Sequence, residues 1–491
     1  MTQVPFDNSY ARLPARFYAR VLPARFPAPR LIRLNKRLAA SLGLDPDWLQ
    51  SPDGLEVLSG QRMANGSEPI ALAYAGHQFG SFVPQLGDGR AILLGEVVAP
   101  DGRRRDIQLK GAGRTPFSRQ GDGRAALGPV LREYVVSEAM AALGIPTTRA
   151  LAAVTTGEAV IRDEVLPGAI LARVAASHVR VGTFQYFAAR SDTEGVRLLA
   201  DHVLARHYPE AAVAERPYRA LLDAVVVAQA DLIARWLLVG FIHGVMNTDN
   251  MSIAGETIDY GPCAFLDAYD PNKVYSSIDR RGRYAYGAQP GIALWNLTRL
   301  AETLLPLLAE DESAAISEAE EALAFFRPRF QQAYETGLMC KLGLFTTREG
   351  DADLATTVLG ALAENQVDFT LFFRQLADAQ VEEAGDAALR ALFQDPASCD
   401  ALLVRWRERL MYETQGVATR RSAMRAVNPA YIPRNHQIEA MITAAVEQDD
   451  FTRMDELLAV LSRPYEDQPE FVRYAQPPQP YEEVQATFCG T

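Results

Sequence analysis

The chain contains 491 residues, of which 48% are hydrophobic and 22% charged, and its formal net charge is −12. This composition is typical of a folded soluble protein and excludes collagen-like, coiled-coil and low-complexity chains. The acidic excess argues against broad affinity for nucleic acid or anionic membranes, because such affinity depends on positive surface charge. We therefore expect neither nucleic acid nor a membrane as a partner.

The cysteines and the apolar segments indicate a cytoplasmic protein, which we also expect to be a monomer. The four cysteines are too few and too scattered for a disulfide framework, and the chain has no Cys/His pattern at metal-binding spacing. The N-terminus lacks the basic and apolar regions of a secretory signal. Charged residues interrupt the most apolar stretch, residues 221–246, which favours a buried helix over a membrane span.

Residues 1–65 are predicted to be an N-terminal extension, rich in Pro and Arg at first, with a helical leucine pattern from Leu31 to Leu42. Residues 66–180 are predicted to form a β-rich lobe with one packed helix, from Leu127 to Met140, which has Pro129 near its start. The β-like runs of this lobe cover 70–74, 91–98, 106–110, 157–162 and 169–174.

Residues 181–380 are predicted to form a helical lobe, with helices at 193–207, 217–243, 293–309, 313–338 and 355–378. The Gly/Asp/Asn-rich connection at 244–292 interrupts them, and a loop of this length in a compact domain tends to be functional. Residues 381–491 are predicted to be a helical extension packed on the larger lobe, with a helix at 397–413 and a Pro-rich tail. The fold class is thus α+β, with two lobes and an extension at each end.

The tetrapeptide Gly-Asp-Gly-Arg occurs twice, at 87–90 and at 121–124. In the first copy the glycines allow a tight turn whose N–H groups approach an anion, and Arg90 adds a group suited to phosphate. A hairpin turn with a solvated Arg90 is the alternative. The second copy is predicted to open the helix that follows, where an N-terminus favours anions. Asp122 can equally be an N-cap.

Several charged residues have the layout of a nucleotide site. Lys110 ends a β-like run, and Glu133 lies in the following helix, as in the Lys–Glu pair of protein kinases. Glu138 is the near alternative, and a solvated surface pair is the other. Arg173 and Arg180 lie at and just after the end of an apolar strand, where an arginine needs an anion or a carboxylate partner.

The segment after the long helix has the order of a kinase catalytic loop. His243-Gly244 is followed by Asn250 and then by Asp259-Tyr260-Gly261. One Asn, one carboxylate and phosphate oxygens suffice for Mg²⁺. The position of the kinase catalytic Asp holds Val245, which cannot accept a proton, so that the nearby Asp249 becomes the candidate base.

Together these motifs resemble the selenoprotein O family of kinase-like protein adenylyltransferases. The resemblance covers chiefly residues 70–290 and rests on segments 74–80, 85–90, 108–119, 121–124, 243–251 and 259–262. It implies a pseudokinase that binds ATP in a flipped orientation and transfers AMP to Ser, Thr or Tyr hydroxyls of proteins, with UMP as an alternative group. A kinase-like phosphotransferase and a non-catalytic nucleotide-binding scaffold are the other hypotheses.

The resemblance also implies roles for matching residues. Asp249 would accept the proton, Asn250 and Asp259 would hold Mg²⁺ or Mn²⁺, and Glu133 would pair with Lys110. The residues implied to bind the nucleotide are Gly87, Gly89, Arg90, Lys110, Asp122, Gly123, Arg173, Arg180 and Asp259.

The C-terminus adds one more implied feature. Some family members have selenocysteine third from the end, where this chain has Cys489, which implies a redox-active thiol. Some relatives pair the terminal Cys with one in the loop after the Asp-aromatic-Gly motif, where this chain has Tyr275. Cys263 is a substitute partner, and a flexible thiol without a role is the alternative.

Overall fold

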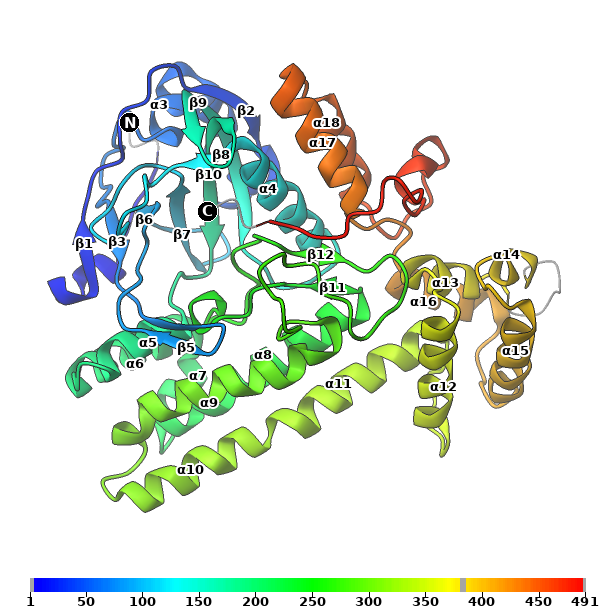
Figure 1. The fold of residues 1–491 in the computed structure, drawn as a ribbon. Coiled ribbons are helices and arrows are strands. Elements are labelled where there is room, and N and C mark those ends of the chain that lie inside the picture. The colour runs from blue at the N-terminus through cyan, green and yellow to red at the C-terminus, as the bar shows by residue number, and fades with distance from the viewer. Residues whose placement is uncertain (1–3, 380–385, 489–491) are drawn as a thin grey trace.

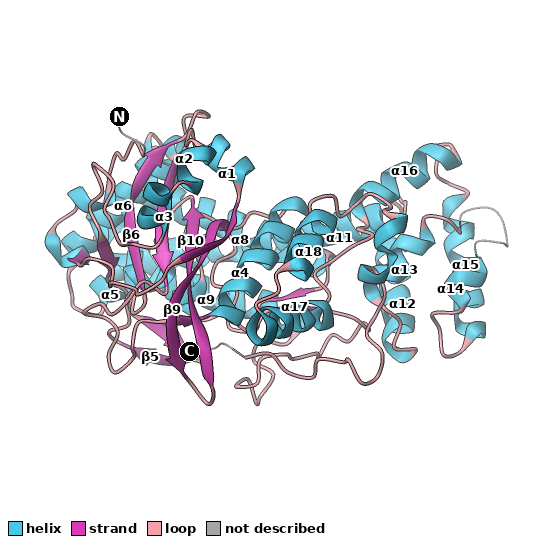
Figure 2. Ribbon diagram, turned by 90° about the horizontal axis from the view of Figure 1, so that it is seen from above, coloured by secondary structure: helices cyan, strands magenta, loops and turns pink. Residues whose placement is uncertain are grey.

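An antiparallel sheet forms one end of the molecule and helices form the other (Figures 1 and 2). The structure is a computed structural model that describes residues 4–379 and 386–488. Among these residues the sheet has eight strands in the order β1-β3-β6-β7-β10-β9-β2, with β8 paired to β10. The strands are β1 (Tyr18–Arg20), β2 (Arg30–Leu34), β3 (Ile70–Leu72), β6 (Ala91–Val98), β7 (Arg104–Lys110), β8 (Ala125–Ala126), β9 (Arg149–Ile161) and β10 (Val165–Ala175). The predicted α+β class is confirmed.

Side chains alternate across this sheet, as the period of two of a strand requires. Leu93 of β6 packs into the core on one face, whereas Ile92 and Leu94 pack on the other. Helix α4 (Leu127–Ala142) covers the first face against β9 and β10. It begins at the predicted residue and places the fully buried Leu131 and Val135 in the core.

The N-terminal segment completes the sheet. The helical pattern predicted from Leu31 is wrong over its first part, because Arg30–Leu34 form β2 and pair with β9. At these residues, backbone hydrogen bonding to the edge of β9 outweighs the helical pattern of the side chains. The helix α1 (Lys36–Ser41) begins only after Asn35, whose side chain caps it by accepting the amide of Leu38. With α2 (Pro46–Gln50) and α3 (Pro52–Leu58), α1 contributes to the core on the second face.

The helical region contains α5 (Val181–Ala188), α6 (Thr193–His207), α7 (Pro209–Ala212), α8 (Pro217–Leu238), α9 (Gln289–Leu308), α10 (Glu312–Ala324), α11 (Phe326–Lys341), α12 (Asp351–Glu364) and α13 (Phe369–Leu376). The helix predicted at 217–243 ends earlier: Gly240 has a φ of 77°, and Phe241–Ile242 form β11, which pairs with β12 (Ala264–Phe265). The helices predicted at 313–338 and 355–378 are each two helices. The second is divided near Gln366, whose φ is 51°.

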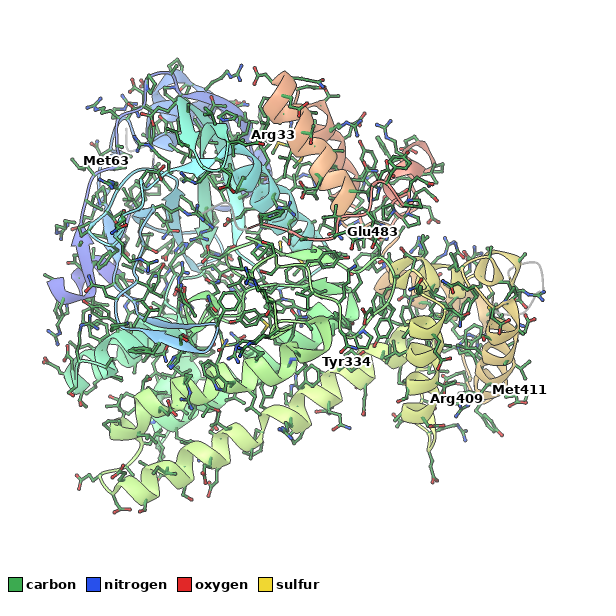
Figure 3. All side chains as sticks on the ribbon, viewed as in Figure 1. Arg33, Met63, Tyr334, Arg409, Met411 and Glu483 are labelled. Atoms are coloured by element: carbon green, nitrogen blue, oxygen red, sulfur yellow. The ribbon has the colours of Figure 1, made fainter. Side chains whose placement is uncertain are left out.

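The C-terminal segment packs on both parts of the molecule. Helices α14 (Asp386–Arg390), α15 (Pro396–Leu410) and α16 (Val417–Val427) extend the helical end, where Figure 3 labels Arg409 and Met411. Helices α17 (Asn435–Gln448) and α18 (Thr452–Leu461) pack on α4, so the extension contacts this helix of the β-rich part in addition to the helical part on which it was predicted to pack. Gly128 permits the close approach, because a Cβ there would lie 2.9 Å from Ile442.

The Pro-rich tail packs on the body of the protein. After a 3₁₀ helix (Pro469–Tyr474), Thr487 donates its amide to the carbonyl of Tyr275 at 2.7 Å and its hydroxyl to the carbonyl of Pro262 at 2.6 Å. Cys489 lies outside the described residues, so its redox role stays a prediction. Within residues 4–379 and 386–488, no helix is long and apolar enough to cross a membrane.

Candidate active site

The predicted site residues line one cavity of about 490 Å³ between the sheet and the loop that follows α8. Among the described residues, seven cationic side chains line it: the four predicted ones, Arg90, Lys110, Arg173 and Arg180, and also Arg119, Arg124 and Arg162. The other predicted residues that line it are Gly87, Gly89, Asp122, Gly123, Glu133, Asp249, Asn250 and Asp259. The fold thus concentrates positive charge in one place, although the whole chain is acidic.

Lys110 and Glu133 form the expected pair. Lys110 ends β7 and Glu133 faces it from α4, with 2.6 Å between Nζ and Oε2. Both side chains are largely buried, at 13% and 5% exposure, so this is not the solvated surface pair of the alternative. Glu138 instead accepts from Arg149 Nε at 2.8 Å, which excludes it as the partner of Lys110.

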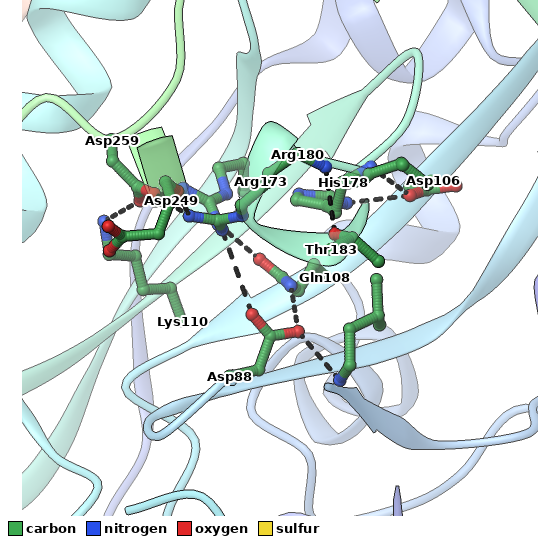
Figure 4. A network of polar contacts seen from close by, with 12 residues as sticks. Asp88, Asp106, Gln108, Lys110, Arg173, His178, Arg180, Thr183, Asp249 and Asp259 are labelled. Carbon is green, nitrogen blue, oxygen red and sulfur yellow. Dashed lines mark hydrogen bonds and ion pairs between the residues drawn. The ribbon is translucent and has the colours of Figure 1, made fainter. Parts of the chain in front are cut away.

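Asp259 lies at the centre of the cationic cluster (Figure 4). Its Oδ1 accepts from Lys110 at 2.8 Å and from Arg173 at 2.6 Å, and its Oδ2 accepts from Arg180 at 2.6 Å. Burial by itself raises its pKa, but the three cations outweigh burial and hold the pKa of Asp259 well below its ordinary value. The carboxylate is therefore ionised throughout the physiological range.

The two arginines are fixed by neighbours that local sequence patterns do not reveal. Arg173 is 1% exposed and donates to Gln108 Oε1 at 2.5 Å and to Glu133 at 3.1 Å. Arg180 lies over the ring of Tyr74 at 4.8 Å and donates to the carbonyl of Asp249 at 2.6 Å. Both guanidinium groups are therefore held in fixed positions at the cavity.

Asp88, within the first Gly-Asp-Gly-Arg, also lines the cavity, and the sequence analysis did not select it. Its Oδ2 accepts from the amide of Leu72 and from Gln108 Nε2, both at 3.1 Å, and burial raises its pKa to about 6. Gly87 has a φ of 87°, and a Cβ there would lie 2.4 Å from the ring of Phe117. The buried Asp88 thus anchors the turn that presents Gly89 to the cavity, and its only sequence signal was its place between two glycines.

The second Gly-Asp-Gly-Arg does not open α4, which corrects the prediction. Strand β8 intervenes, and the helix begins at Leu127 with no side-chain cap. Asp122 accepts the amide of Arg124 at 2.9 Å and pairs with Arg162 at 2.8 Å, so it caps its own turn and not the helix. Gly123 is packed so tightly that a Cβ would lie 2.2 Å from the backbone of Gly113.

The catalytic-loop motif places Val245, Asp249 and Asn250 in the cavity. One carboxylate oxygen of Asp249, Oδ1, is buried and has no hydrogen-bond partner among the described residues, and Oδ2 accepts from Gln78 at 3.4 Å. Burial raises the pKa of Asp249 to about 6. The amide nitrogen of Asn250 donates to the carbonyl of Val245 at 3.0 Å, which leaves Oδ1 of Asn250 to accept or to bind a cation.

The hairpin of β4 (Gly76–Gln78) and β5 (Ser81–Val83) holds this loop, a role that the sequence analysis did not assign. The amide of His77 donates to Thr248 Oγ1 at 2.7 Å, and the amide of Phe79 donates to Asn247 Oδ1 at 3.0 Å. Segment 74–80, which is part of the family resemblance, therefore bonds the two residues that precede Asp249 and holds them in place.

The oxygen donors of the site fit a hard divalent cation. No group of three or more His, Cys, Asp or Glu side chains in the described part of the chain is arranged to hold a metal. Asn250 and Asp259 line the same cavity and offer amide and carboxylate oxygens. This pair suits Mg²⁺ or Mn²⁺, which commonly complete their coordination with phosphate oxygens and water.

Comparison with known proteins gives the family. The family model described as "Protein adenylyltransferase SelO" matches residues 1–462. Two relatives are named "Protein nucleotidyltransferase YdiU", and each alignment spans 99% of this chain and 99% of the relative. One comes from Rhodopseudomonas palustris, at 66% identity over 487 residues, and the other from Methylorubrum extorquens, at 67% over 493 residues. A third, from a Bradyrhizobium species, is 66% identical over 487 residues with the same coverage. The chain therefore belongs to the SelO family of protein adenylyltransferases and is a protein nucleotidyltransferase.

Proposed function

We propose that this enzyme transfers AMP from ATP to Ser, Thr or Tyr hydroxyls of proteins and releases pyrophosphate. The observation that supports the proposal is the position of the candidate proton acceptor in the catalytic-loop motif. Val245 occupies the position of the kinase base and cannot accept a proton, whereas the buried Asp249 lines the cavity and one of its carboxylate oxygens has no hydrogen-bond partner among the described residues. The proposed base thus lies further along the loop than in a kinase, and the nucleotide is proposed to bind in a flipped orientation.

The cations of the cavity would bind the phosphates of ATP. Lys110, Arg173 and Arg180 now share the carboxylate of Asp259, and phosphate oxygens would replace part of these contacts. The turns at Gly87, Gly89 and Gly123 bring the backbone close to the same cavity, with Arg90 and Asp122 beside them. Negative charge grows on the leaving pyrophosphate in the transition state, and preorganised cations stabilise it there.

Asp249 would act as the general base. The acceptor oxygen attacks the α-phosphorus, the bond from this phosphorus to the bridging oxygen breaks, and pyrophosphate leaves with that electron pair. The hydroxyl proton passes to the carboxylate of Asp249. A pKa of about 6 keeps this carboxylate ionised at neutral pH and makes it a stronger base than an ordinary Asp.

Asn250 and Asp259 would hold Mg²⁺ or Mn²⁺. When bound, such an ion neutralises phosphate charge and orients the nucleotide. Glu133 would keep Lys110 in place while Asp259 exchanges cationic partners for the metal, because Glu133 bonds both Lys110 and Arg173.

Labelled nucleotides test the proposal. Incubation with Mg²⁺ and ATP labelled at the α- or the γ-phosphate is expected to give protein-bound label from the α position only, and Asp249→Asn and Asp259→Ala are expected to abolish it. Label from the γ position only would establish a kinase-like phosphotransferase. Nucleotide binding without any label would establish a non-catalytic scaffold. UTP labelled at the α-phosphate, run in parallel, decides between AMP and UMP.

A further inference from the structure

A surface of mixed aromatic and basic character adjoins the cavity that contains Asp249. We define it as the acceptor face, made of Phe79, Phe82, Ile278, Arg280, Arg281 and Arg283. Phe79 and Ile278 line the same cavity as Asp249, and β5, which carries Phe82, is labelled in Figure 1. The apolar members are exposed by 36% at Phe79, 40% at Phe82 and 56% at Ile278.

Contacts fix this face to the catalytic loop. A Cβ on Gly80 would lie 3.7 Å from Cζ of Arg283, so the guanidinium of Arg283 packs against the tip of the hairpin. The rings of Phe79 and Tyr284 are 5.2 Å apart, and the hydroxyl of Tyr284 donates to Asn247 Oδ1 at 2.6 Å. A ligand on the acceptor face is therefore held at a defined position relative to the residues that precede Asp249.

The arginines of the acceptor face carry uncompensated charge. Within the described residues, none of Arg280, Arg281 and Arg283 forms an ion pair, and the first two are exposed. The adjacent Asp279 is buried, and its carboxylate accepts the backbone amides of Arg283 and Tyr284 at 2.9 and 2.7 Å. Arg283 and Arg299 both lie over the ring of Trp295, but Arg299, in contrast to Arg283, pairs with Glu302 at 2.6 Å.

We propose that the acceptor face docks acceptor proteins through acidic residues that flank the target hydroxyl. The inference rests on the proposed function and names the substrate class of the same site. The chain as a whole is acidic, with a net charge of −12, so the exposed arginines of the acceptor face give an acidic segment a local site of attraction close to Asp249. Phe79 and Phe82, both partly exposed on the adjoining hairpin, supply apolar contact for the same segment.

Binding of short fluorescent peptides tests the inference without depending on catalysis. Three peptides carry one central Tyr flanked by Glu, by Gln or by Lys, and fluorescence anisotropy measures their affinity for the full chain saturated with Mg²⁺ and a non-hydrolysable ATP analogue. The double variant R280E/R281E reverses the charge of the face. The matched control R327E/R453E makes the same change in net charge at exposed arginines on α11 and α18, outside the cavity.

The Glu peptide is expected to bind most tightly, to weaken as salt rises, and to lose roughly tenfold in affinity in R280E/R281E but not in R327E/R453E. Equal binding of the three peptides, or equal loss in both variants, overturns the inference. A single-stranded oligonucleotide that binds the face as tightly as the Glu peptide also overturns it, in favour of nucleic acid. Selective binding of the Glu peptide, with no transfer of label from the α-phosphate to protein, would contradict the proposed function and would still support the docking surface.

Discussion

The backbone of Gly76 lies directly against the carboxylate of Asp249. A Cβ on Gly76 would be 2.7 Å from Oδ1 of Asp249 and 3.1 Å from its Cβ, closer than ordinary van der Waals contact. The hairpin that carries Gly76 therefore sets the position of the proposed base, and the absence of a side chain there is what allows the carboxylate to face the cavity.

Gly76→Ala is expected to displace the carboxylate of Asp249 and to lower kcat by roughly a hundredfold, because a misplacement of about 1 Å costs that much in an acid–base step. Affinity for ATP, measured by calorimetry, is expected to stay near that of the unchanged protein. The control is Gly360→Ala in α12, where an added Cβ meets nothing within 4 Å. A kcat equal in the two variants contradicts the positioning role of Gly76.

The rate of transfer is expected to depend on the ionisation of Asp249. Its pKa of about 6 predicts that kcat/KM rises with pH below this value and levels off above it. The measurement is a pH profile of initial rates with the α-labelled nucleotide. A profile that is flat between pH values of about 5 and 8 would show that Asp249 does not accept the proton.

Asp249→Asn is expected to stabilise the fold while it abolishes transfer. Burial raises the pKa of Asp249 from 3.8 to about 6, so this carboxyl favours the folded state while protonated, and that stabilisation is lost as pH rises from 3.8 through about 6. At neutral pH the buried Asp249 is charged and destabilises the fold, whereas an Asn in its place is neutral. The free energy of unfolding of Asp249→Asn is therefore expected to be higher by about 3 kcal/mol. Denaturant titration of both proteins measures it.

Asp351→Asn is the control of opposite sign for that measurement. Burial by itself raises the pKa of Asp351, but the bond from Arg409 and other contacts hold it below its ordinary value. The ionised carboxylate of Asp351 therefore stabilises the fold at pH values above its ordinary pKa of 3.8, and this stabilisation is lost as the pH falls below that value. Asn at this position is expected to lower the free energy of unfolding at neutral pH. Equal signs for the two variants would refute the assignment for Asp249.

Glu133→Gln is expected to weaken ATP binding about tenfold, because Lys110 and Arg173 lose one of the two carboxylates that position them and keep only that of Asp259. Glu138→Gln, one turn further along α4, removes a carboxylate that bonds Arg149. It is expected to lower the melting temperature and to leave ATP affinity unchanged. Calorimetric titration with ATP distinguishes them, and an equal loss of affinity in both contradicts a specific role for Glu133.

Removal of residues 484–491 is expected to free the segment that precedes the acceptor face. The amide of Ser277 donates to the carbonyl of Thr487 at 3.1 Å, and Thr487 also bonds Tyr275 and Pro262. Without the tail, the Ser277 amide loses its acceptor and exchanges with solvent faster, as hydrogen–deuterium exchange measures. Unchanged protection of this amide would show that the tail does not hold the segment in solution.

Local patterns in the sequence determined much of the site. The run at 91–98 predicted β6 to the residue, because a short, mostly apolar segment between turn residues is typical of a strand that is buried on both faces. The order of His243, Val245, Asp249 and Asn250 indicated a displaced base. The pairing of Lys110 with Glu133 was predicted correctly, because a strand and the helix that follows it pack together and a set sequence spacing then brings the two side chains into contact. The corrected elements are those whose ends depend on distant partners, such as Arg30–Leu34, which pairs with β9 as an edge strand.

Only the tertiary structure decided which residues brace the site. Gly76 and Gln78 reach Asp249 across a sequence separation of about 170 residues, and Asp88 meets Gln108 and Arg180 inside the cavity. The packing of α17 and α18 on α4 is equally remote from any local signal. Such contacts arise from burial and charge compensation between segments far apart in the chain, and a pattern within one segment carries no information about the partner that burial will bring to it.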